Sequence, residues 1–358
     1  MKKEVLLFDV TYEDDEKSSK IKLFVKEKNE TYWLYDEKFK PYLYIIISVG
    51  ELKEKKEFLE KNIGEEGFKI FKIEETGQKI FGKEVLKIFF KKVSHLIAAR
   101  KEFSELGIQK FEYDINFAKR YLIDNALEPG NYLEIEEENK KIISIKKIDK
   151  EFNAKIGSFD LETFSTDKFE IGKQPIIMAS ITEQEKNNFN SKIYSYKTKK
   201  VDNLELLKNE EELIEKINSK INEWDLIVTY NGDNFDFPYI KKRAEKYKKQ
   251  FLINKEEIRI KRHGLDNAVE LKGKQHIDSY QIMKFLQRTG SINIVKLDLE
   301  NVSEKIFGIK KEKVYPKEIN EAWEKGIGLE RLVSYNKEDA ETTLKIAQQF
   351  LPLFQEIS

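Results

Sequence analysis

KIGSFDLETF (residues 155–164) places two acidic residues inside an apolar run that is typical of a β-strand. Asp160 and Glu162 are two positions apart, so in a strand both side chains emerge on the same face of the sheet. Isolated carboxylates are costly to bury, and acids within a core strand are usually paired with a cation or a metal ion. The stretch therefore predicts a buried strand with two carboxylates that converge on one point.

The spacing alone is weak support, because the same Asp-x-Glu pattern recurs in this acid-rich chain and normally marks a solvated surface pair. Strand-forming apolar neighbours separate Asp160 from three of the other occurrences. Asp298, in VKLDLENV (residues 295–302), shares the apolar context and is the rival. The other three occurrences begin at Asp14, Asp149 and Asp339.

A second polar cluster follows an apolar strand, in YNGDNFDFPYI (residues 230–240). Asn-Gly followed by Asn and Asp favours a turn and a helix N-cap, because these side chains bond to nearby backbone. Phe235 and Phe237 flank Asp236, and this arrangement suggests anchors that fix the direction of its carboxylate. Asp236 is the candidate site residue, whereas Asp233 is assigned to the turn or the cap.

A third signal lies in the last predicted helix, in YNKEDAETT (residues 335–343). Tyr335 and Asp339 are four positions apart, so the phenol and the carboxylate share one helical face. A tyrosine packed on the core beside an exposed aspartate would give the same pattern, and the spacing alone leaves both interpretations open.

The first part of the chain is rich in short strands with aromatic and branched residues. It continues in the order strand, helix, strand, strand, helix, strand, which predicts a ferredoxin-like βαββαβ plait. The opening strands are predicted at residues 4–12, 20–27 and 31–37. The plait follows as strand 42–48, helix 51–62, strands 68–75 and 85–90, helix 94–106 and strand 108–115.

A helical stretch at residues 117–127 is followed by EPGNY (residues 128–132), whose Pro-Gly pair predicts a turn and a domain boundary. We therefore expect a β-rich domain at residues 1–130 and a second domain at residues 131–358. The second mixes strands and helices, which indicates an α/β or α+β fold. Its helices are predicted near residues 209–223, 235–249 and 329–357.

Composition limits the possible functions. Lys plus Arg and Asp plus Glu both number 65, so a nucleic-acid surface would have to be local. The absence of cysteine excludes disulfides and thiolate chemistry and predicts an intracellular, cytoplasmic protein. His95, His263 and His276 are scattered and are interpreted as surface or packing residues. No apolar run approaches the ~20 residues that span a bilayer, so no membrane association is expected.

Together FDLET (residues 159–163), YNGDNFDFPYI and YNKEDA (residues 335–340), in that order, resemble the three exonuclease motifs of family B DNA polymerases of the archaeal replicative type. Further segments resemble the same family in the same order, so the likeness covers nearly the whole chain. They are DEKFKPYLY (36–44), DINFAKRYLID (114–124), ELKGKQHIDSY (270–280) and KEKVYPKEINEAWEKGIGLERL (311–332).

The resemblance implies an N-terminal domain followed by a ribonuclease-H-like 3'-5' proofreading exonuclease that uses two Mg²⁺ or Mn²⁺ ions. By motif, the implied ligands are four carboxylates, and carboxylate oxygens suit these hard cations. Asp160 would bridge both ions, Glu162 and Asp339 would complete the site that activates water, and Asp236 would hold the second ion through water. Tyr335 would orient the nucleophile.

The implied partners are single-stranded DNA and primer-template DNA. Phe235 and Phe237 could stack on bases, although core packing explains them equally well. Asn231 would contact the strand or order the turn. The basic run KKRAEKYKK (residues 241–249) could track phosphates, or it could be a solvated helix face. Its candidate contacts are Lys241, Lys242 and Arg243.

The resemblance also implies a template-uracil pocket in the N-terminal domain. The matching positions are Tyr12, Pro41, Phe117 and Arg120. The chain departs from the family at Val93, where proline is usual, and at Leu96, where valine is usual. A larger Leu96 side chain could fill or reshape a pocket for a flat pyrimidine.

The likeness stops where the polymerase module of the family begins, and none of the 358 residues offers the aspartate motifs of the palm. We therefore expect no DNA synthesis from this chain alone. An excised fragment, a natural truncation and one subunit of a split polymerase remain open, and the last would bind a separate polymerase chain. A DNA-binding or assembly module with little turnover is the alternative to an active exonuclease.

Overall fold

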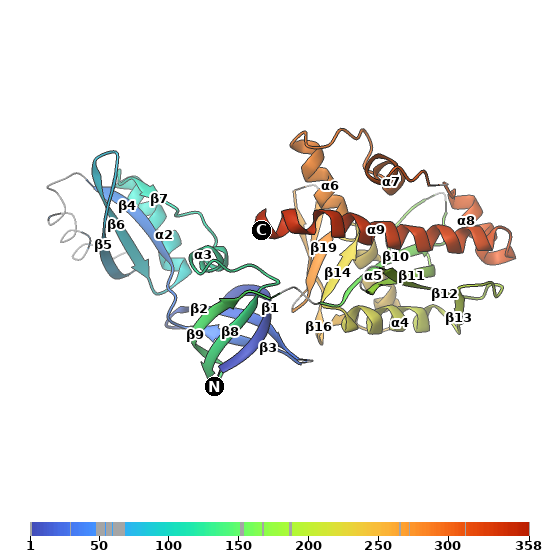
Figure 1. The fold of residues 1–358 in the computed structure, drawn as a ribbon, viewed down its shortest axis with the longest axis horizontal. Helices are drawn as coiled ribbons and strands as arrows, with labels where there is room; N and C mark the ends of the chain where they lie inside the picture. Colours follow the sequence, from blue (N-terminus) through green and yellow to red (C-terminus); the bar gives the residue numbers. More distant parts are fainter. Residues whose placement is uncertain are drawn as a thin grey trace. The chain divides into compact units, whose positions relative to one another are not determined.

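The chain forms two compact units, Met1–Phe152 and Asn153–Ser358, and each has a hydrophobic core of its own. Figure 1 colours the first unit from blue to green and the second from green to red. The computed structural model describes most of the chain, namely residues 2–28, 30–47, 54, 59, 69–150, 154–166, 168–185, 188–264, 266–271, 273–311 and 313–357.

The first unit contains a closed barrel with the strand order β1-β2-β3-β9-β8. Alternate side chains along the strands fill its interior, where Leu7, Leu23 and Leu133 are fully buried. Helix α3 (Phe117–Asp124) packs on this core through Phe117 and Tyr121. The barrel strands are β1 (Lys2–Asp14), β2 (Ser19–Glu27), β3 (Glu30–Asp36), β8 (Tyr132–Glu138) and β9 (Lys141–Ile148).

The predicted domain boundary at residue 130 is corrected by this barrel. β8 pairs with β1, and β9 pairs with β8 and β3, so both strands belong to the first unit. The Pro-Gly turn connects α3 to β8 within that unit, and Gly130 adopts a left-handed φ of 97° there. The boundary therefore falls between residues 152 and 153.

The rest of the first unit is the predicted plait, with the antiparallel sheet order β5-β6-β4-β7. Helix α2 (Val93–Glu105) packs on the sheet through Ala99 and Phe103. The predicted helix at residues 51–62 lies outside the described residues except for positions 54 and 59. The strands are β4 (Tyr42–Ile47), β5 (Ile70–Ile80), β6 (Lys83–Phe90) and β7 (Lys110–Phe111).

The second unit is built on a six-stranded mixed sheet with the order β13-β12-β11-β10-β14-β19. β10, β11 and β12 are antiparallel neighbours, whereas β14 and β19 run parallel to β10, as expected for a ribonuclease-H-like fold. The strands are β10 (Ile156–Thr163), β11 (Ile176–Glu185), β12 (Asn188–Tyr196), β13 (Leu204–Leu207), β14 (Leu226–Thr229) and β19 (Gln275–Asp278).

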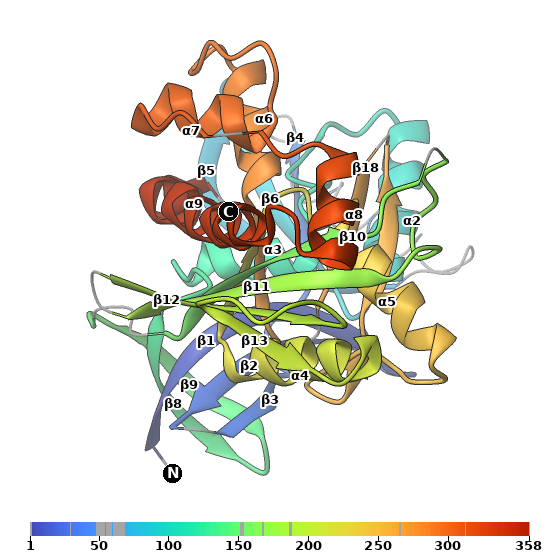
Figure 2. The ribbon, with the colours of Figure 1, turned by 90° about the vertical axis from the view of Figure 1, so that its right-hand side faces the viewer.

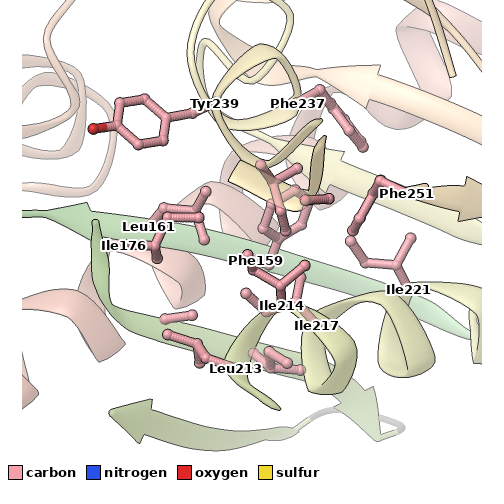
Figure 3. Packing of buried hydrophobic residues seen from close by; sticks show 14 of the residues in the cluster. Phe159, Leu161, Ile176, Leu213, Ile214, Ile217, Ile221, Phe237, Tyr239 and Phe251 are labelled. Atoms are coloured by element: carbon pink, nitrogen blue, oxygen red, sulfur yellow. The ribbon is translucent and has the colours of Figure 1, made fainter. Parts of the chain in front are cut away.

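Helices cover both faces of this sheet. On one face α4 (Glu210–Glu223) and α5 (Asp236–Lys246) bury an apolar cluster against β10, where Phe159 and Leu161 meet Ile217 of α4 and Phe237 of α5 (Figure 3). On the other face α9 (Leu329–Ile357) crosses β10, β11, β12 and β14. Figure 2 shows the sheet between α9 and α4.

Small polar residues of the sheet let α9 approach closely. Ser158 Oγ of β10 donates to the carbonyl oxygen of Ala340 at 2.7 Å, and Ser180 Oγ of β11 donates to that of Asn336 at 2.8 Å. Because side chains alternate along a strand, Asp160 lies on the same side of β10 as Ser158. The helix therefore carries its own polar residues, Asp339 among them, to the acidic side of β10.

The remaining elements of the second unit surround this framework. Within the described residues, no helix combines the length and the apolar composition that crossing a membrane requires. The elements are β15 (Leu252–Ile253), β16 (Glu256–Glu257), β17 (Arg259–His263), β18 (Asp266–Glu270), α6 (Ser279–Arg288), α7 (Leu299–Phe307) and α8 (Pro316–Lys325).

Candidate active site

Three carboxylates meet on the α9 side of the sheet. Asp160 and Glu162 come from β10 and Asp339 comes from α9, and each offers an oxygen within 4.8 Å of the other two. The period of two along the strand places the first pair on one face, and the close approach of α9 adds the third residue. The structure thus brings together the acids that the first and third motifs predict.

Asp236 joins this group as the first residue of α5. β10 pairs with β14 only over Ile156–Ser158, so the next part of its edge is left to α5, and the backbone of Leu161 bonds to the Asp236 carboxylate. The charge of Asp236 raises the pKa of both Asp160 and Glu162. Its Oδ1 atom is buried and has no hydrogen-bond partner within the described part of the chain.

Burial is the first cause of the strongly raised pKa of each carboxyl group, because a low-dielectric site disfavours the charged form. It raises the pKa of Glu162 and of Asp236 to about 8 and that of Asp339 to about 6. The pKa of Asp160 also lies well above its ordinary range, and the charge of Asp339 adds to the effect of burial. Four acids in such a site require either protons or cations.

This donor set fits divalent metal ions. All four groups supply hard oxygen ligands, which suit Mg²⁺ or Mn²⁺. The unpaired Oδ1 of Asp236 is a ligand atom without a partner, and such buried atoms normally mark a missing water or ion. Asp160, Glu162 and Asp339 offer oxygen atoms close enough together to hold an ion.

Lys311 provides a cation within the site, and sequence reasoning missed it. Its ammonium group forms an ion pair with Asp339, and its side chain is 1% exposed. The Nζ atom lies 5.7 Å from the ring centroid of Tyr335. The pair lowers the pKa of Asp339 against the effect of burial. Nothing in the Lys- and Glu-rich run around Lys311 distinguishes it from exposed lysines.

Asn336 was also missed. Its Nδ2 atom donates to Asp160 Oδ2 at 2.7 Å, and the residue is fully buried. Asn336 lies three positions before Asp339 on α9, so both side chains face the sheet. One amide thereby fixes the orientation of the central carboxylate.

Tyr335 lies at the margin of the carboxylate group. Its hydroxyl donates to Glu300 Oε1 at 3.3 Å and also bonds to Asp339. Burial and the nearby carboxylates raise the pKa of Tyr335, which therefore stays protonated. The two acids of the rival Asp-x-Glu pattern, Asp298 and Glu300, have different roles. Asp298 caps α7 by accepting from the Asn301 N–H at 3.0 Å, whereas Glu300 contacts Tyr335.

The turn before Asp236 is held by a residue that the sequence did not single out. Asp278 accepts hydrogen bonds from the backbone N–H groups of Asn231 at 2.7 Å and Asp233 at 3.0 Å. Asn231 adopts a left-handed φ of 62°, and its carbonyl accepts from the Phe235 N–H at 2.9 Å. Asp233 accepts from the backbone of Val269 at 2.8 Å. Asn231 and Asp233 therefore order the turn.

Two predicted DNA contacts are buried in the second unit. Phe237 is fully buried, with ring centroids 5.4 Å from Phe159, so its packing role is the one observed. Arg243 is also buried and forms a bidentate ion pair with Glu210. Neither side chain is free to contact a strand, and both predictions are corrected.

The other predicted contacts remain accessible. Phe235 is half-buried and stacks on Phe169, which is 61% exposed, with ring centroids 5.9 Å apart. Lys242 is exposed, whereas the ammonium group of Lys241 donates to the Ile258 carbonyl at 3.1 Å. The exposed ring of Phe169 thus stacks on the residue that directly precedes Asp236 in the chain.

The residues of the implied uracil pocket divide between two clusters of the first unit. Tyr12 and Val93 pack with Phe117 in the barrel cluster, whereas Leu96 packs with the plait. Phe39 stacks on Phe117 with ring centroids 5.6 Å apart. Arg120 is buried and forms ion pairs with Glu112 at 2.7 Å and Asp124 at 3.6 Å, and the carbonyl of Pro41 accepts from the Phe90 N–H at 2.8 Å.

In the presence of a chelator, the unfolding temperature should fall as the pH rises from 5 to 9. The folded-state pKa values of the site carboxyls lie above the unfolded values near 4, so the folded protein binds more protons across this window. Stability therefore decreases as the pH rises. One pKa unit corresponds to ~1.4 kcal/mol, which predicts a loss of several kcal/mol. Differential scanning calorimetry in EDTA measures it.

Mn²⁺ or Mg²⁺ should raise the unfolding temperature more at pH 8.5 than at pH 5.5, because protons compete for the same oxygen atoms. An unfolding temperature in EDTA that rises steadily from pH 5 to pH 9 would contradict the predicted decrease.

Comparison with known proteins decides the family. The family model described as DNA polymerase family B, exonuclease domain, matches residues 108–302, which is more than half of the chain. The chain belongs to DNA polymerase family B. The match includes Asp160, Glu162 and Asp236 and ends before Tyr335 and Asp339.

Archaeal family B polymerases are similar to nearly the whole chain. It is 35% identical over 357 residues to DNA polymerase 1 of Pyrococcus abyssi and 34% identical over 361 residues to the DNA polymerase of Thermococcus gorgonarius. These matches cover 97% and 99% of the chain but 43% of each relative, so the chain spans less than half the length of these polymerases.

A solved structure supports the fold. The family B DNA polymerase of the hyperthermophilic archaeon Pyrobaculum calidifontis superposes with a TM-score of 0.73 at 19% sequence identity. The match covers 98% of this chain and 46% of that one. The exonuclease domain of family B and its ribonuclease-H-like architecture thus account for the second unit.

Proposed function

We propose that the second unit is a 3'-5' exonuclease that removes nucleotides from single-stranded DNA ends, including the frayed 3' ends of primer-template DNA. The observation that carries the proposal is the convergence of Asp160, Glu162 and Asp339 within 4.8 Å, with Asp236 beside them. Four buried acids are unstable as a purely structural cluster, because burial raises the pKa of each of them, and the charges of Asp339 and Asp236 further raise the pKa of Asp160 and Glu162. A cation-dependent reaction on a phosphodiester accounts for this cluster, because bound cations would offset the charges of the acids.

The single-stranded form of the substrate is supported by the position of the acids. The exposed fraction is 2% for Asp236, 6% for Asp339 and 8% for Glu162. A scissile phosphate therefore has to enter a confined site. Phe235 directly precedes Asp236 and stacks on the exposed ring of Phe169, and exposed rings bind unpaired bases through stacking. A terminal nucleotide separated from its complement satisfies both conditions.

In the proposed reaction, water attacks the terminal phosphodiester phosphorus and the 3' oxygen of the preceding nucleotide leaves, which releases a nucleoside 5'-monophosphate. Two divalent cations, when bound, supply Lewis-acid activation and charge neutralisation at such a centre. Asn336 fixes Asp160 through the 2.7 Å hydrogen bond, and Lys311 holds Asp339. The Tyr335 hydroxyl, which stays protonated, orients the attacking water.

Tyr335→Phe should slow hydrolysis ~10- to 100-fold in single-turnover experiments while DNA affinity changes little. The ring keeps its packing, and only the hydroxyl that bonds to Asp339 and Glu300 is removed. A loss confined to the rate constant means that the missing contact acts in the transition state. Unchanged single-turnover rates would assign Tyr335 to packing.

The proposed function is tested with a 5'-labelled single strand, the full chain and Mg²⁺ or Mn²⁺. A ladder that shortens from the 3' end, disappears with EDTA and is absent for a strand with a blocked 3' end supports the exonuclease. A strand labelled at its 3' terminal nucleotide should release the label as a mononucleotide in the first cleavage step. No shortening at high protein concentration would leave a DNA-binding or assembly module as the better description.

Uracil sensing by the first unit is a second candidate function. The packing of Tyr12, Val93 and Phe117 in one cluster supports it, because these positions form the implied pocket. The ring of Phe39 occupies one face of Phe117, so a base would have to displace it. A fluorescence titration in EDTA should show tighter binding to a uracil-containing strand than to the matched thymine strand, and equal affinity rejects this function.

A further inference from the structure

The plait of the first unit has one face that its known packing does not explain. The opposite face is buried, since Ala99 and Phe103 of α2 pack with Leu86 and Ile88 of β6. The strand register determines which side chains share the remaining face. Tyr42 of β4, Phe89 of β6 and Lys72 of β5 lie opposite one another in one row.

A second row lies beside the first, where Tyr44 of β4 is opposite Lys87 of β6. Phe71 of β5 adds a ring that is 48% exposed. We call these residues the aromatic–lysine face, which consists of Tyr42, Tyr44, Phe71, Lys72, Lys87 and Phe89.

This face is hollowed. A cavity of about 360 Å³ is lined, among the described residues, by four lysines and four aromatic residues, and none of these described lining residues is acidic. The whole chain has equal numbers of acidic and basic residues, so this lining is much more positively charged than the chain as a whole. Lysines with exposed rings on a sheet are the combination by which proteins bind single-stranded nucleic acid, through phosphate contacts and base stacking.

The positions of the lysines fit phosphates beside the rings. Lys87 Nζ lies 3.7 Å from the ring centroid of Tyr42 and 5.1 Å from that of Phe89. Lys72 Nζ lies 5.6 Å from the Phe89 ring, and Lys91 Nζ lies 5.4 Å from the Phe71 ring. Two of the described acids neighbour this group. Glu74 of β5 lies 2.9 Å from Lys72 and opposite Lys87, and Asp124 accepts a hydrogen bond from the Tyr42 hydroxyl at 2.6 Å.

We propose that the aromatic–lysine face binds single-stranded DNA, with Phe71, Phe89 and Tyr44 stacking on bases and Lys72 and Lys87 contacting phosphates. The site belongs to the first unit and is distinct from the carboxylates that would hydrolyse the strand. It requires no base-specific group, so binding tolerates different sequences. The lysines match phosphates and the rings match unpaired bases, and DNA is chosen as the occupant because the second unit of the same chain is proposed to act on single-stranded DNA ends, so this choice rests on the proposed function.

The proposal is tested by isothermal titration of the full chain with the octanucleotide dT8 in EDTA, so that nothing is hydrolysed. Phe89→Ala should weaken the interaction at this face at least ~10-fold, as expected from the loss of one stacking partner. Lys87→Glu should weaken it as well and reduce the dependence on salt, because each phosphate contact contributes ~0.7 to the log–log slope for a single strand. Lys101→Glu, on α2 and 84% exposed, is the matched control and should change neither property.

Two further measurements keep this result separate from the exonuclease. Thermal unfolding verifies that each variant is folded, and Phe89→Tyr, which keeps the ring, should bind like the wild type. Single-turnover cleavage of a saturating trinucleotide should be unchanged in Lys87→Glu, because it is too short to depend on a second site. If the wild-type protein hydrolyses no substrate, the proposed exonuclease function is overturned, but the titration in EDTA still tests binding at this face.

Equal dT8 affinity and salt dependence in wild type, Phe89→Ala and Lys87→Glu would overturn the proposal. Competition experiments decide the identity of the occupant. An octa-glutamate peptide that displaces dT8 equally well would show simple attraction of negative charge, and rU8 that binds 10-fold more tightly at this face would show an RNA site. Either result would overturn DNA as the occupant.

Discussion

Asp160→Asn should abolish exonuclease activity while making the metal-free protein more stable above pH 7. Asp160 is the central carboxylate, whose pKa is raised by burial and by Asp339, Asp236 and Glu162. An amide removes one of the repelling charges, yet its oxygen can still accept the hydrogen bond from Asn336. We expect a gain of about 1–3 kcal/mol in EDTA at pH 8, because the folded protein no longer has to protonate or bury the charge of a carboxyl group whose pKa is raised by burial.

The activity of the same variant should fall by at least ~10³-fold, the range for groups that act directly at a reacting centre. The assay is shortening of a 5'-labelled single strand with Mn²⁺, and calorimetry measures the stability. Asp202→Asn, at an exposed position of the same unit, is the control and should alter neither quantity. Full activity would remove Asp160 from the site, and a loss of activity together with a less stable metal-free protein would indicate misfolding instead.

Arg243→Met should destabilise the second unit by about 3–5 kcal/mol, because it leaves Glu210 buried without its partner. Arg243 donates from Nε and Nη2 to both carboxylate oxygens of Glu210, and its Nη1 atom donates to the Lys173 carbonyl at 3.1 Å. Glu210 in turn accepts from the Ile176 N–H at 2.8 Å. The pair therefore connects α4, α5 and the start of β11.

The unfolding temperature and single-strand affinity distinguish this structural role from a DNA contact. Lys242→Met, at the exposed neighbouring position, should leave the unfolding temperature within about a degree of wild type. The double variant Glu210→Gln, Arg243→Met should recover part of the loss, because the unpaired charge is gone. A normal unfolding temperature with weaker DNA binding in Arg243→Met would restore Arg243 as a DNA contact.

Periodicity predicted which acidic side chains share a face, and the resemblance to family B polymerases joined those faces into one site. The period of two in FDLET and the four-residue spacing of Tyr335 and Asp339 place each pair on one face, and the structure brings those faces together. The barrel was harder to predict, because the strands that close it, β8 and β9, are separated in sequence from β1 to β3 by the whole plait. The Pro-Gly turn before β8 is a local signal and cannot reveal that long-range pairing.

Burial explains the errors on α5. Phe237, Ile240, Arg243 and Ala244 are all buried and follow helical spacing from Asp236, so the inner face of the helix continues through the basic run. The many positive charges of KKRAEKYKK conceal this helical period. The spacing of the buried residues separates Arg243, on the inner face, from Lys242, on the outer face. Lys311 had no such signal, since its burial depends on the tertiary position of Asp339.

The course of α9 across the sheet has a consequence during biosynthesis. Asp160 and its hydrogen-bond partner Asn336 are 176 positions apart, and the serines that receive the helix bond to its backbone rather than to local neighbours. A ribosome-bound chain can complete the plait and most of the sheet while Asp339 is still unsynthesised. The proposed hydrolytic capacity would therefore appear only when α9 emerges and docks, and partially made chains would carry Asp160, Glu162 and Asp236 without the fourth acid.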